Sequence, residues 1–318
     1  MNDDRSVTLV TGAAGFAGSH LVEHLSGRGQ LVAWTRNSVP PPLAALATWQ
    51  KVDLLDRDTV RRAISELKPS LVYHCAGAPH VPHSWQHTTD ALSSNVLTTH
   101  YLLDSLRRAS VECRMLIAGS AMVYARSATP ITEDHPLAPS SPYGLSKLAQ
   151  EQLGLRAVRE DGVDVIVTRS FNHTGPRQSA DFAAAGMARQ VALVERGALP
   201  AVKVGNLDAQ RDLTDVRDTV RAYSLLMTAG RAGGVYNVSS GVARPIREVL
   251  DGLLARARTD VRVETDPERV RPNDIALLVG DSTRLRTATG WAPAISFGQM
   301  LDDLLEYWRA EVQRPAYA

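Results

Sequence analysis

Two residues in the middle of the chain have side chains that can move protons. Tyr143 and Lys147 stand four residues apart, and Pro142 suits the first turn of a helix, so both side chains should emerge on one helix face. A free phenol has a pKa of about 10, and an adjacent ammonium favours its ionised form. We therefore predict that Lys147 lowers the pKa of Tyr143 and makes it a general acid or base near neutral pH. A solvated pair on a helix surface would have the same spacing.

A hydroxyl group is available for the same reaction. Ser120 follows a strand that we expect at Met115–Ala118 and lies at the carboxyl end of that strand, where open α/β sheets assemble their sites. Its hydroxyl could bind the substrate oxygen that Tyr143 protonates. Ser120, Tyr143 and Lys147 together indicate proton transfer at a carbonyl.

A glycine-rich turn near the start of the chain predicts where a dinucleotide binds. Thr11–Gly18 has the spacing Gly-x-x-Gly-x-x-Gly, between a strand expected at Val7–Thr11 and a helix expected at Gly15–Ser26. Glycines there let backbone N–H groups approach a pyrophosphate at the positive end of the helix. Tight turns also use glycine without any ligand, but this context favours a nicotinamide dinucleotide. The predicted contacts in the turn are Gly12, Ala14, Gly15, Phe16 and Ala17.

The second strand, expected at Leu31–Thr35, bears on the choice of cofactor. A strand in this position normally ends in an acid that binds the adenosine ribose, but here Thr35 is followed by Arg36 and Asn37. A cation there would bind an anionic 2′-phosphate, so we predict NADP(H), with NAD(H) as the alternative if Arg36 is only a solvated loop cation. Further cofactor contacts are predicted at Asp53, Leu54, Cys75, Ala76 and Gly77.

The spacing of apolar runs predicts an α/β fold. Short β-rich runs alternate with helical segments through about residue 170, the pattern of a parallel sheet covered by helices on both faces. We expect a Rossmann-type doubly wound parallel sheet in 1–171 with a returning segment at about 212–241, and a smaller α/β substrate-binding lobe in 172–211 and 242–318. The remaining expected strands are Leu71–Cys75, Asp164–Arg169 and Val235–Ser239, the last returning to the main sheet. The remaining expected helices are Arg57–Leu67, Asn95–Ala109, Tyr143–Glu160 and Leu301–Val312.

Composition argues against several classes of protein. The 318 residues have a net charge of +1 with basic and acidic residues interleaved, unlike a nucleic-acid binder. The presence of only two cysteines, Cys75 and Cys113, without a secretory leader or an apolar run of about 18 residues, predicts a cytoplasmic protein with no membrane span. His80, His83 and His87 lack the His-Glu-x-x-His pattern, so no metal site is predicted.

Longer motifs resemble those of the extended short-chain dehydrogenase/reductase family, in its nucleotide-sugar branch. The resemblance runs from Val7 almost to the C-terminus. The matching segments are Thr11–Gly18, Ser120 with Val123 and Tyr124, Glu133–Pro136, Ser141–Lys147 and Arg169–Pro176.

Within that branch, three segments are most similar to GDP-4-keto-6-deoxy-mannose reductases and GDP-mannose 4,6-dehydratases. These segments are Phe171–Pro176, Val204–Asp212 and Val270–Asp274. The family motif usually has Gly where Arg177 stands here, so this chain departs from the pattern in that loop.

The resemblance implies roles for individual residues. Ser120, Tyr143 and Lys147 would be the catalytic set, Lys147 would hold the nicotinamide ribose, and a homodimer would form through the Tyr143 helix. Additional cofactor contacts would be Ala118, Phe171 and His173. A GDP-linked nucleotide sugar would be bound by Ser84, Trp85, Ser120, Asn172, Val204, Arg211, Arg271 and Asp274. Trp85 could equally be a core residue.

Three reactions use this catalytic set. We predict NADPH-dependent reduction of the 4-keto group of a 6-deoxy sugar, with GDP-4-keto-6-deoxy-D-mannose giving GDP-D-rhamnose or an epimeric product. Similar dehydratases place carboxylates immediately after the catalytic Ser or Thr, where Ala121 and Met122 stand here, so dehydration is disfavoured. A 4-epimerase keeps its cofactor bound and uses the same residues, and it is the main alternative. A non-catalytic NADP-binding sensor or scaffold is the other.

Overall fold

A seven-stranded parallel sheet forms the centre of the computed structural model, which describes residues 6–269 and 275–314. The strand order is β10-β6-β5-β4-β1-β2-β3. These strands are β1 (Val7–Thr11), β2 (Gln30–Thr35), β3 (Thr48–Lys51), β4 (Leu71–His74), β5 (Arg114–Ala118), β6 (Asp164–Ser170) and β10 (Val235–Val238). The expected strands are confirmed within a residue or two, and the segment at Val235 returns to the sheet as predicted, where it pairs with β6.

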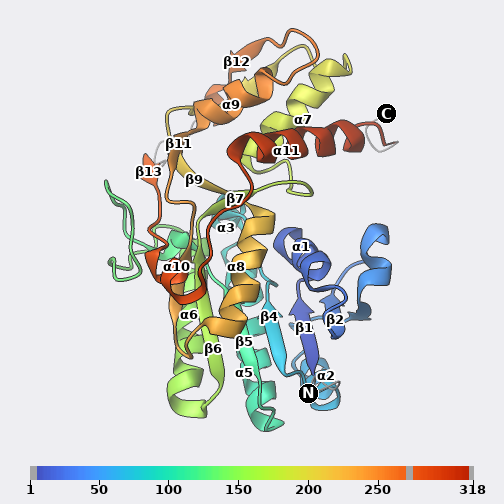
Figure 1. Cartoon of the computed structure of the whole chain (residues 1–318), viewed down its shortest axis with the longest axis vertical. Helices are drawn as coiled ribbons and strands as arrows, with labels where there is room; N and C mark the ends of the chain where they lie inside the picture. The colour runs from blue at the N-terminus through green and yellow to red at the C-terminus, as the bar shows by residue number, and fades with distance from the viewer. Residues whose placement is uncertain (1–5, 270–274, 315–318) are drawn as a thin grey trace.

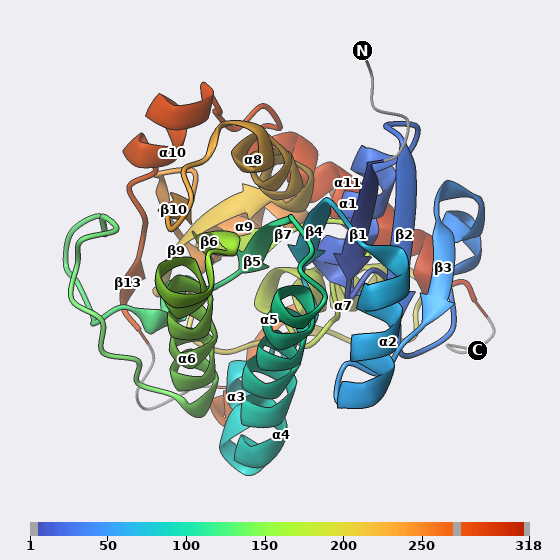
Figure 2. The same ribbon diagram turned by 90° about the horizontal axis from the view of Figure 1, so that it is seen from below.

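Helices cover both faces of this sheet, which is why its strands are apolar on both sides. Seen along the sheet in Figure 2, α1 and α8 lie on one face and α2, α5 and α6 on the other. On the first face are α1 (Phe16–Leu25), α8 (Val216–Ala229) and α10 (Thr283–Thr289); on the second are α2 (Arg57–Leu67), α5 (Thr98–Arg108) and α6 (Pro142–Arg156). Two of the predicted helices contain a π-helical turn, because η2 (Ser93–Leu97) precedes α5 and η4 (Ala157–Asp161) follows α6.

The strand order reverses direction at the pair β1 and β4, which lie side by side in the sheet. Thr11, the last residue of β1, is in register with His74, the last residue of β4. The loops that leave these two strands diverge to opposite sides, and open α/β sheets bind ligands at such a point. Any dinucleotide site should therefore lie at the carboxyl ends of β1 and β4.

A second lobe lies beyond the carboxyl edge of the sheet, where Figure 1 shows α7, α9 and α11 gathered. These helices are α7 (Ala183–Glu195), α9 (Ile246–Leu254) and α11 (Phe297–Glu311), and they share one apolar core. Two small sheets adjoin them: β11 (Ala243–Pro245), β9 (Gln210–Asp215), β13 (Leu277–Leu278) and β7 (Asn172–Thr174) in one, β8 (Val202–Val204) and β12 (Val263–Thr265) in the other. The predicted residue boundaries between the two lobes stay a prediction. The helix α10 packs against α8 and β10 of the first lobe, although our prediction assigned its residues mainly to the second lobe.

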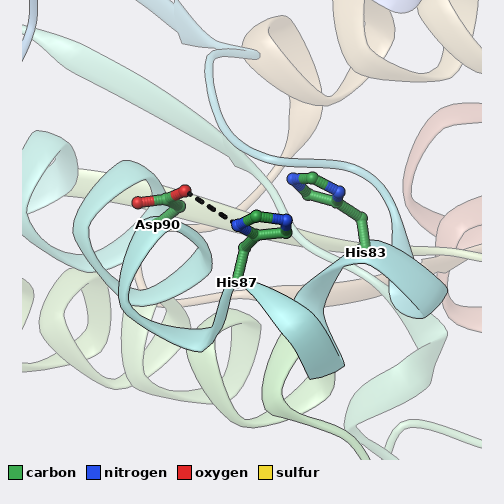
Figure 3. A group of neighbouring side chains, drawn as sticks. All are labelled: His83, His87 and Asp90. Atoms are coloured by element: carbon green, nitrogen blue, oxygen red, sulfur yellow. Dashed lines mark ion pairs between the residues drawn. The ribbon is translucent and has the colours of Figure 1, made fainter.

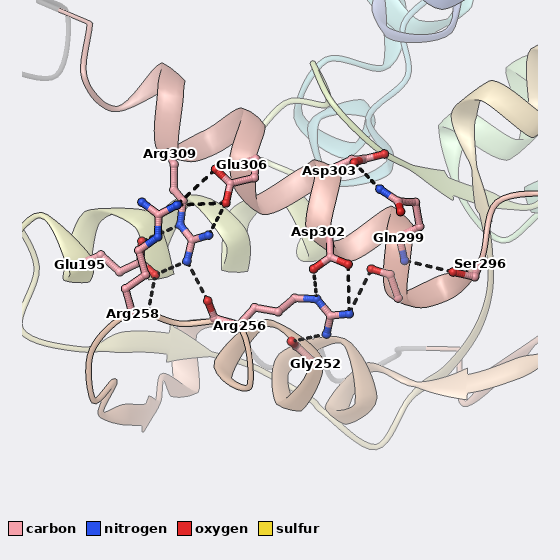
Figure 4. Close-up of polar contacts among 11 residues, drawn as sticks. Glu195, Gly252, Arg256, Arg258, Ser296, Gln299, Asp302, Asp303, Glu306 and Arg309 are labelled. Atoms are coloured by element: carbon pink, nitrogen blue, oxygen red, sulfur yellow. Dashed lines mark hydrogen bonds and ion pairs between the residues drawn. The ribbon is translucent and has the colours of Figure 1, made fainter.

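Arginines hold the helices of the second lobe together (Figure 4). Arg309 of α11 donates two hydrogen bonds to Glu195 at the end of α7, at 2.8 and 2.5 Å. Arg256, just after α9, pairs with Asp302 of α11 at 2.5 Å. Since each pair links two different helices, the network fixes how α7, α9 and α11 cross.

Short elements complete the chain, and the sequence predicted none of them. They are η1 (Pro41–Leu46), α3 (Val81–Gln86), α4 (Thr88–Leu92), η3 (Ala121–Val123) and η5 (Pro267–Arg269). Two prolines, Pro41 and Pro42, occupy the first turn of η1, where their missing N–H groups cost no hydrogen bond. Within the described residues, every helix is too short or too polar to cross a lipid bilayer.

Candidate active site

The structure brings Ser120, Tyr143 and Lys147 together at the carboxyl edge of the main sheet. Ser141 caps α6 by accepting a hydrogen bond from the N–H of Gly144, and Pro142 occupies the first turn. This start places Tyr143 and Lys147 on the buried face of α6, while Ser120 follows β5. The Ser120 hydroxyl lies near enough to Tyr143 to lower the pKa of its phenol, so the two hydroxyls can bind one substrate oxygen.

The pKa of Tyr143 is shifted in the opposite direction from our prediction. Burial raises the pKa of Tyr143 above its ordinary value, and the nearby Ser120 hydroxyl offsets this only in part. The prediction that Lys147 brings the phenol toward neutral pH is therefore wrong for the protein without ligands. Tyr143 is a protonated phenol at neutral pH, which is the form that can donate a proton to a ketone.

Lys147 is buried without a carboxylate partner among the described residues. Its Nζ donates hydrogen bonds to the carbonyl oxygen of Ala118 and to Oε1 of Gln150, both at 2.8 Å. Burial lowers the pKa of Lys147 to about 8, so the group remains largely an ammonium near neutral pH.

Ser84 supports the start of α6. The backbone N–H of Tyr143 donates to Oγ of Ser84 at 3.1 Å, and Ser84 itself donates to the carbonyl of Val81 at 2.7 Å. Ser84 is thus buried beside Tyr143. The neighbouring Trp85 is 63% exposed, so the alternative that it is a core residue is wrong, and a role in binding substrate stays a prediction.

The glycine turn has the close contacts that a dinucleotide site needs. Gly12 has φ +65°, and a Cβ there would lie 2.6 Å from the backbone nitrogen of Ala76. A Cβ on Gly18 would lie 2.2 Å from the carbonyl oxygen of Gly12, so the first turn of α1 also depends on glycine. Gly15, at the N-cap of α1, is exposed, and the other predicted turn residues, Ala14, Phe16 and Ala17, are partly buried.

The loop after β4 faces this turn. Cys75, Ala76 and Gly77 follow His74, and the backbone of Cys75 and Ala76 contacts Gly12 directly. Burial raises the pKa of the Cys75 thiol to about 12, so the group is a neutral thiol beside the site. The two loops therefore pack closely against each other at the carboxyl ends of β1 and β4.

The residues predicted for the adenosine end lie at the ends of β2 and β3. Arg36 and Asn37 are exposed just after β2, where the N–H of Asn37 donates to Oγ1 of Thr35 at 3.2 Å. Asp53 is exposed and accepts a hydrogen bond from the N–H of Leu55, while Leu54 is buried. Arg36 is therefore accessible to an anionic ligand.

The segment after β6, which contains β7, connects the two lobes beside the glycine turn. His173 stacks on Phe16 with ring centroids 5.7 Å apart, and Asn172 is exposed next to it. Phe171 is buried against Tyr124, so its side chain belongs to the core and a cofactor contact there stays a prediction.

Arg177 stands where the family motif usually has Gly, and the structure shows the backbone conformation of this loop. Arg177 has φ +70°, the left-handed conformation that glycine adopts most readily, so the loop keeps a glycine-like backbone. Its guanidinium donates to both carboxylate oxygens of Glu23 on α1, at 2.7 and 2.6 Å.

Two of the predicted nucleotide-sugar residues, Val204 and Arg211, lie in the second lobe. Val204 is buried in β8, and Arg211 on β9 is partly buried, with its guanidinium donating to the carbonyls of Gln210 and Ile275. Arg271 and Asp274 lie outside the described residues, so the structure does not place them.

Three side chains near the site come close enough to share a cation. His83, His87 and Asp90 place one donor atom each within 4.8 Å of one another, and Figure 3 shows His87 directed at Asp90. The two imidazoles stack at 4.0 Å and all three groups are exposed. The spacing rules used on the sequence do not anticipate this group because α3 and α4 meet at His87.

Sequence reasoning missed a set of buried polar residues behind Lys147. They are His74, Asn95, Thr99, Ser146 and Gln150, each at most 1% exposed. Asn95 and Thr99 share a helix face with Leu102 and Leu106, so polar residues within an apolar helical stripe were the available signal.

Comparisons with known proteins agree over nearly the whole chain. The model of the GDP-mannose 4,6 dehydratase family matches residues 9–304. GDP-6-deoxy-D-mannose reductase of Pseudomonas aeruginosa is 36% identical over 96% of this chain and 98% of that protein. The structure of RMD from Pseudomonas aeruginosa complexed with NADPH has a TM-score of 0.86 at 34% identity, over 96% of this chain and 100% of that one. The UDP-glucose 4-epimerase of Thermotoga maritima with UDP-glucose has a TM-score of 0.86 at 25% identity, over 96% and 99%.

Proposed function

Because the chain belongs to the GDP-mannose 4,6 dehydratase family, we propose that it is an NADPH-dependent reductase of a GDP-linked 4-keto-6-deoxy sugar. The observation that carries this proposal is that Tyr143 and Lys147 are buried on one face of α6, with Ser120 following β5 at the carboxyl edge of the sheet. We take GDP-4-keto-6-deoxy-D-mannose as the substrate and GDP-D-rhamnose or its epimer as the product. The similar reductase and the NADPH complex support this choice.

The chain's own residues divide the work of carbonyl reduction. Ser120 and Tyr143 bind the ketone oxygen together, and Tyr143 donates its proton to that oxygen as negative charge develops there. Lys147 places a positive charge beside the reacting group and binds the cofactor ribose. When bound, NADPH supplies the hydride for the carbonyl carbon.

The residues at the glycine turn fit a dinucleotide. Gly12 lets the turn pack against the backbone of Ala76, and the N-terminus of α1 offers its first N–H groups to a pyrophosphate. At the other end, the exposed Arg36 suits a 2′-phosphate, which supports NADPH over NADH.

Dehydration would need a further proton donor and acceptor near Ser120. Ala121 and Met122 line a small pocket there, and its described lining contains no carboxylate. The other lining residues are Tyr124, Ala125, Arg126, Ser127, Ile131, Ser140, Ile275, Leu277 and Leu278. This absence supports reduction rather than dehydration.

A 4-epimerase is the second candidate because of the likeness to the Thermotoga maritima enzyme. Purified protein mixed with NADPH and GDP-4-keto-6-deoxy-D-mannose should oxidise one NADPH for each sugar converted, measured by absorbance. Interconversion of a nucleotide sugar and its 4-epimer without net NADPH consumption would favour the epimerase. NADPH binding with no turnover of any nucleotide sugar would favour a sensor or scaffold.

We also propose that the protein is a cytoplasmic homodimer that forms through α6. Leu145 on α6 and Leu97 on η2 are exposed apolar side chains on neighbouring elements, which supports an apolar contact there. The molar mass from light scattering should be twice that of the 34.5 kDa chain.

A further inference from the structure

A continuous series of buried hydrogen bonds leads from Lys147 back into the sheet. Lys147 donates to Oε1 of Gln150 at 2.8 Å, and Nε2 of Gln150 donates to Oγ1 of Thr99 at 2.7 Å. Oγ1 of Thr99 lies 2.9 Å from Nε2 of His74, whose Nδ1 lies 2.7 Å from Oγ1 of Thr11. Gln150, Thr99, His74 and Thr11 are all fully buried.

Counting protons fixes the direction of every bond in this series. The single hydroxyl proton of Thr99 goes to the carbonyl of Asn95 at 2.7 Å, so Thr99 must accept from both Gln150 and His74. His74 therefore carries its proton on Nε2 and accepts from Thr11 on Nδ1. Burial lowers the pKa of His74 to about 3, so the imidazole is neutral, as this count requires.

The same count of protons determines the orientation of the side-chain amide of Gln150. Because Thr99 has no proton to give it, the nitrogen of Gln150 must face Thr99 and its oxygen must face Lys147. Ala118 accepts a second proton from Lys147. An ammonium has three N–H groups, so the third is available for a ligand in the site.

The other groups that face Lys147 supply no negative charge at neutral pH. His74 is neutral, burial raises the pKa of the Cys75 thiol to about 12, and Tyr143 is a protonated phenol. The ammonium is therefore stabilised in its buried position by two neutral oxygens, from Ala118 and Gln150.

We propose that Gln150 is a positioning residue that holds Lys147 as an ammonium and directs its third N–H into the active site. Its role in catalysis rests on the proposed reductase function, whereas its effect on Lys147 does not. Thr99 and His74 keep the amide from turning, so Lys147 is in place before any cofactor binds.

Two substitutions of Gln150 should shift the pKa of Lys147 in opposite directions. Gln150→Met keeps the length and removes the acceptor oxygen, so the pKa of Lys147 should fall by about one unit. Gln150→Glu places a carboxylate beside the ammonium, so the pKa of Lys147 should rise by about one unit. A residue that only filled space would not produce opposite shifts.

Lysine NMR measures this directly, because the chain has lysines only at 51, 68, 147 and 203. Full-length protein labelled with ¹³C at lysine Cε would be titrated from about pH 6 to about pH 11, around the ordinary lysine value. Lys147→Arg assigns the signal, the other three lysines, all exposed, are reference signals that should not move, and circular dichroism reports whether each variant is folded. Gln299→Glu on the exposed face of α11 adds the same charge elsewhere and should leave Lys147 unchanged.

The proposal would be overturned if Lys147 had the same pKa in wild type, Gln150→Met and Gln150→Glu. It would also be overturned if both substitutions shifted the pKa of Lys147 in the same direction. If Gln150→Met does not fold, an unshifted or lowered pKa in Gln150→Glu still overturns it. In the reductase assay, the alkaline limb of kcat/KM should move to lower pH in Gln150→Met and to higher pH in Gln150→Glu. Opposite NMR shifts without wild-type turnover would refute the reductase function and leave the role of Gln150 intact.

Discussion

Among single residues, Tyr143 matters most, because it is the group that donates a proton to the ketone in the proposed reduction. Tyr143 is buried and remains a phenol, the Ser120 hydroxyl lies near it, and the Lys147 ammonium is held by Ala118 and Gln150. The site is thus prepared to donate a proton, which suits reduction of a carbonyl.

Removing the phenolic hydroxyl tests that role. Tyr143→Phe keeps the ring on the buried face of α6 and removes the proton donor, so kcat should fall by about 10²- to 10⁴-fold. The Kd for NADPH, measured by fluorescence titration, should change by less than about threefold, since the ring packing is kept. A variant that keeps near wild-type kcat would show that another group supplies the proton.

Arg177 offers a test of backbone strain. Both Arg177→Gly and Arg177→Ala lose the ion pair with Glu23, but only glycine adopts φ +70° without cost. The glycine variant should therefore be more stable than the alanine variant by about 1 kcal/mol in urea unfolding. Equal stabilities would mean that the loop relaxes to a different backbone conformation.

At this scale the sequence predicted types and positions of side chains better than their ionisation. The spacing of Tyr143 and Lys147 was sufficient to place both on one face of α6. It could not predict that burial outweighs the ammonium in setting the pKa of Tyr143, because burial depends on the loops packed over the site. Gln150 was missed for the same reason, since its partner Thr99 lies on another helix.

At the scale of elements, the turn between β1 and α1 determines how closely a cofactor can approach. Gly12→Ala and Gly27→Ala both put alanine at a positive φ, +65° and +78°, so they share the backbone cost. Only at Gly12 would the new Cβ meet a neighbour, the nitrogen of Ala76 at 2.6 Å, whereas nothing lies within 4 Å at Gly27.

Gly12→Ala should therefore weaken NADPH binding by at least about tenfold, while Gly27→Ala should keep the wild-type Kd within about twofold. Fluorescence titration of both variants measures the difference. Similar losses in the two variants would mean that general destabilisation, and not the contact with Ala76, controls binding.

Elements with many apolar residues were predictable, and short ones were not. The strands β1 and β6 are buried on both faces and have the continuous apolar runs typical of parallel sheets. In contrast, β7, β8 and β12 are three residues each and pair with strands distant in the sequence, so they carry no periodicity of their own.

At the scale of the whole molecule, the loop after β6 links the second lobe to α1. His20 on α1 lies 2.8 Å from the carbonyl of Pro176, and burial lowers its pKa to about 4. The unfolded chain, with a histidine pKa of 6.5, binds more protons than the folded protein between these values, so stability is lost as pH falls from about 6.5 toward 4.

Between pH 7 and pH 5, His20 should account for about 2 kcal/mol of lost stability. His20→Gln can still donate to Pro176 but does not titrate, so its unfolding free energy from urea denaturation should fall less over this range. His100→Gln, at an exposed position, should behave like wild type. An unchanged pH dependence in His20→Gln would show that the buried imidazole is protonated in the folded protein.

Transfer of hydride from NADPH to C4 of the sugar is the central step of the proposed function, and isotope labelling tests it directly. Single turnover of GDP-4-keto-6-deoxy-D-mannose with NADPH that carries deuterium at both C4 positions of the nicotinamide should give a product sugar with one deuterium at C4 and an equal amount of NADP⁺, measured by mass spectrometry. A sugar that is converted without deuterium, while the added NADPH remains reduced, would contradict a reductase with an exchangeable cofactor.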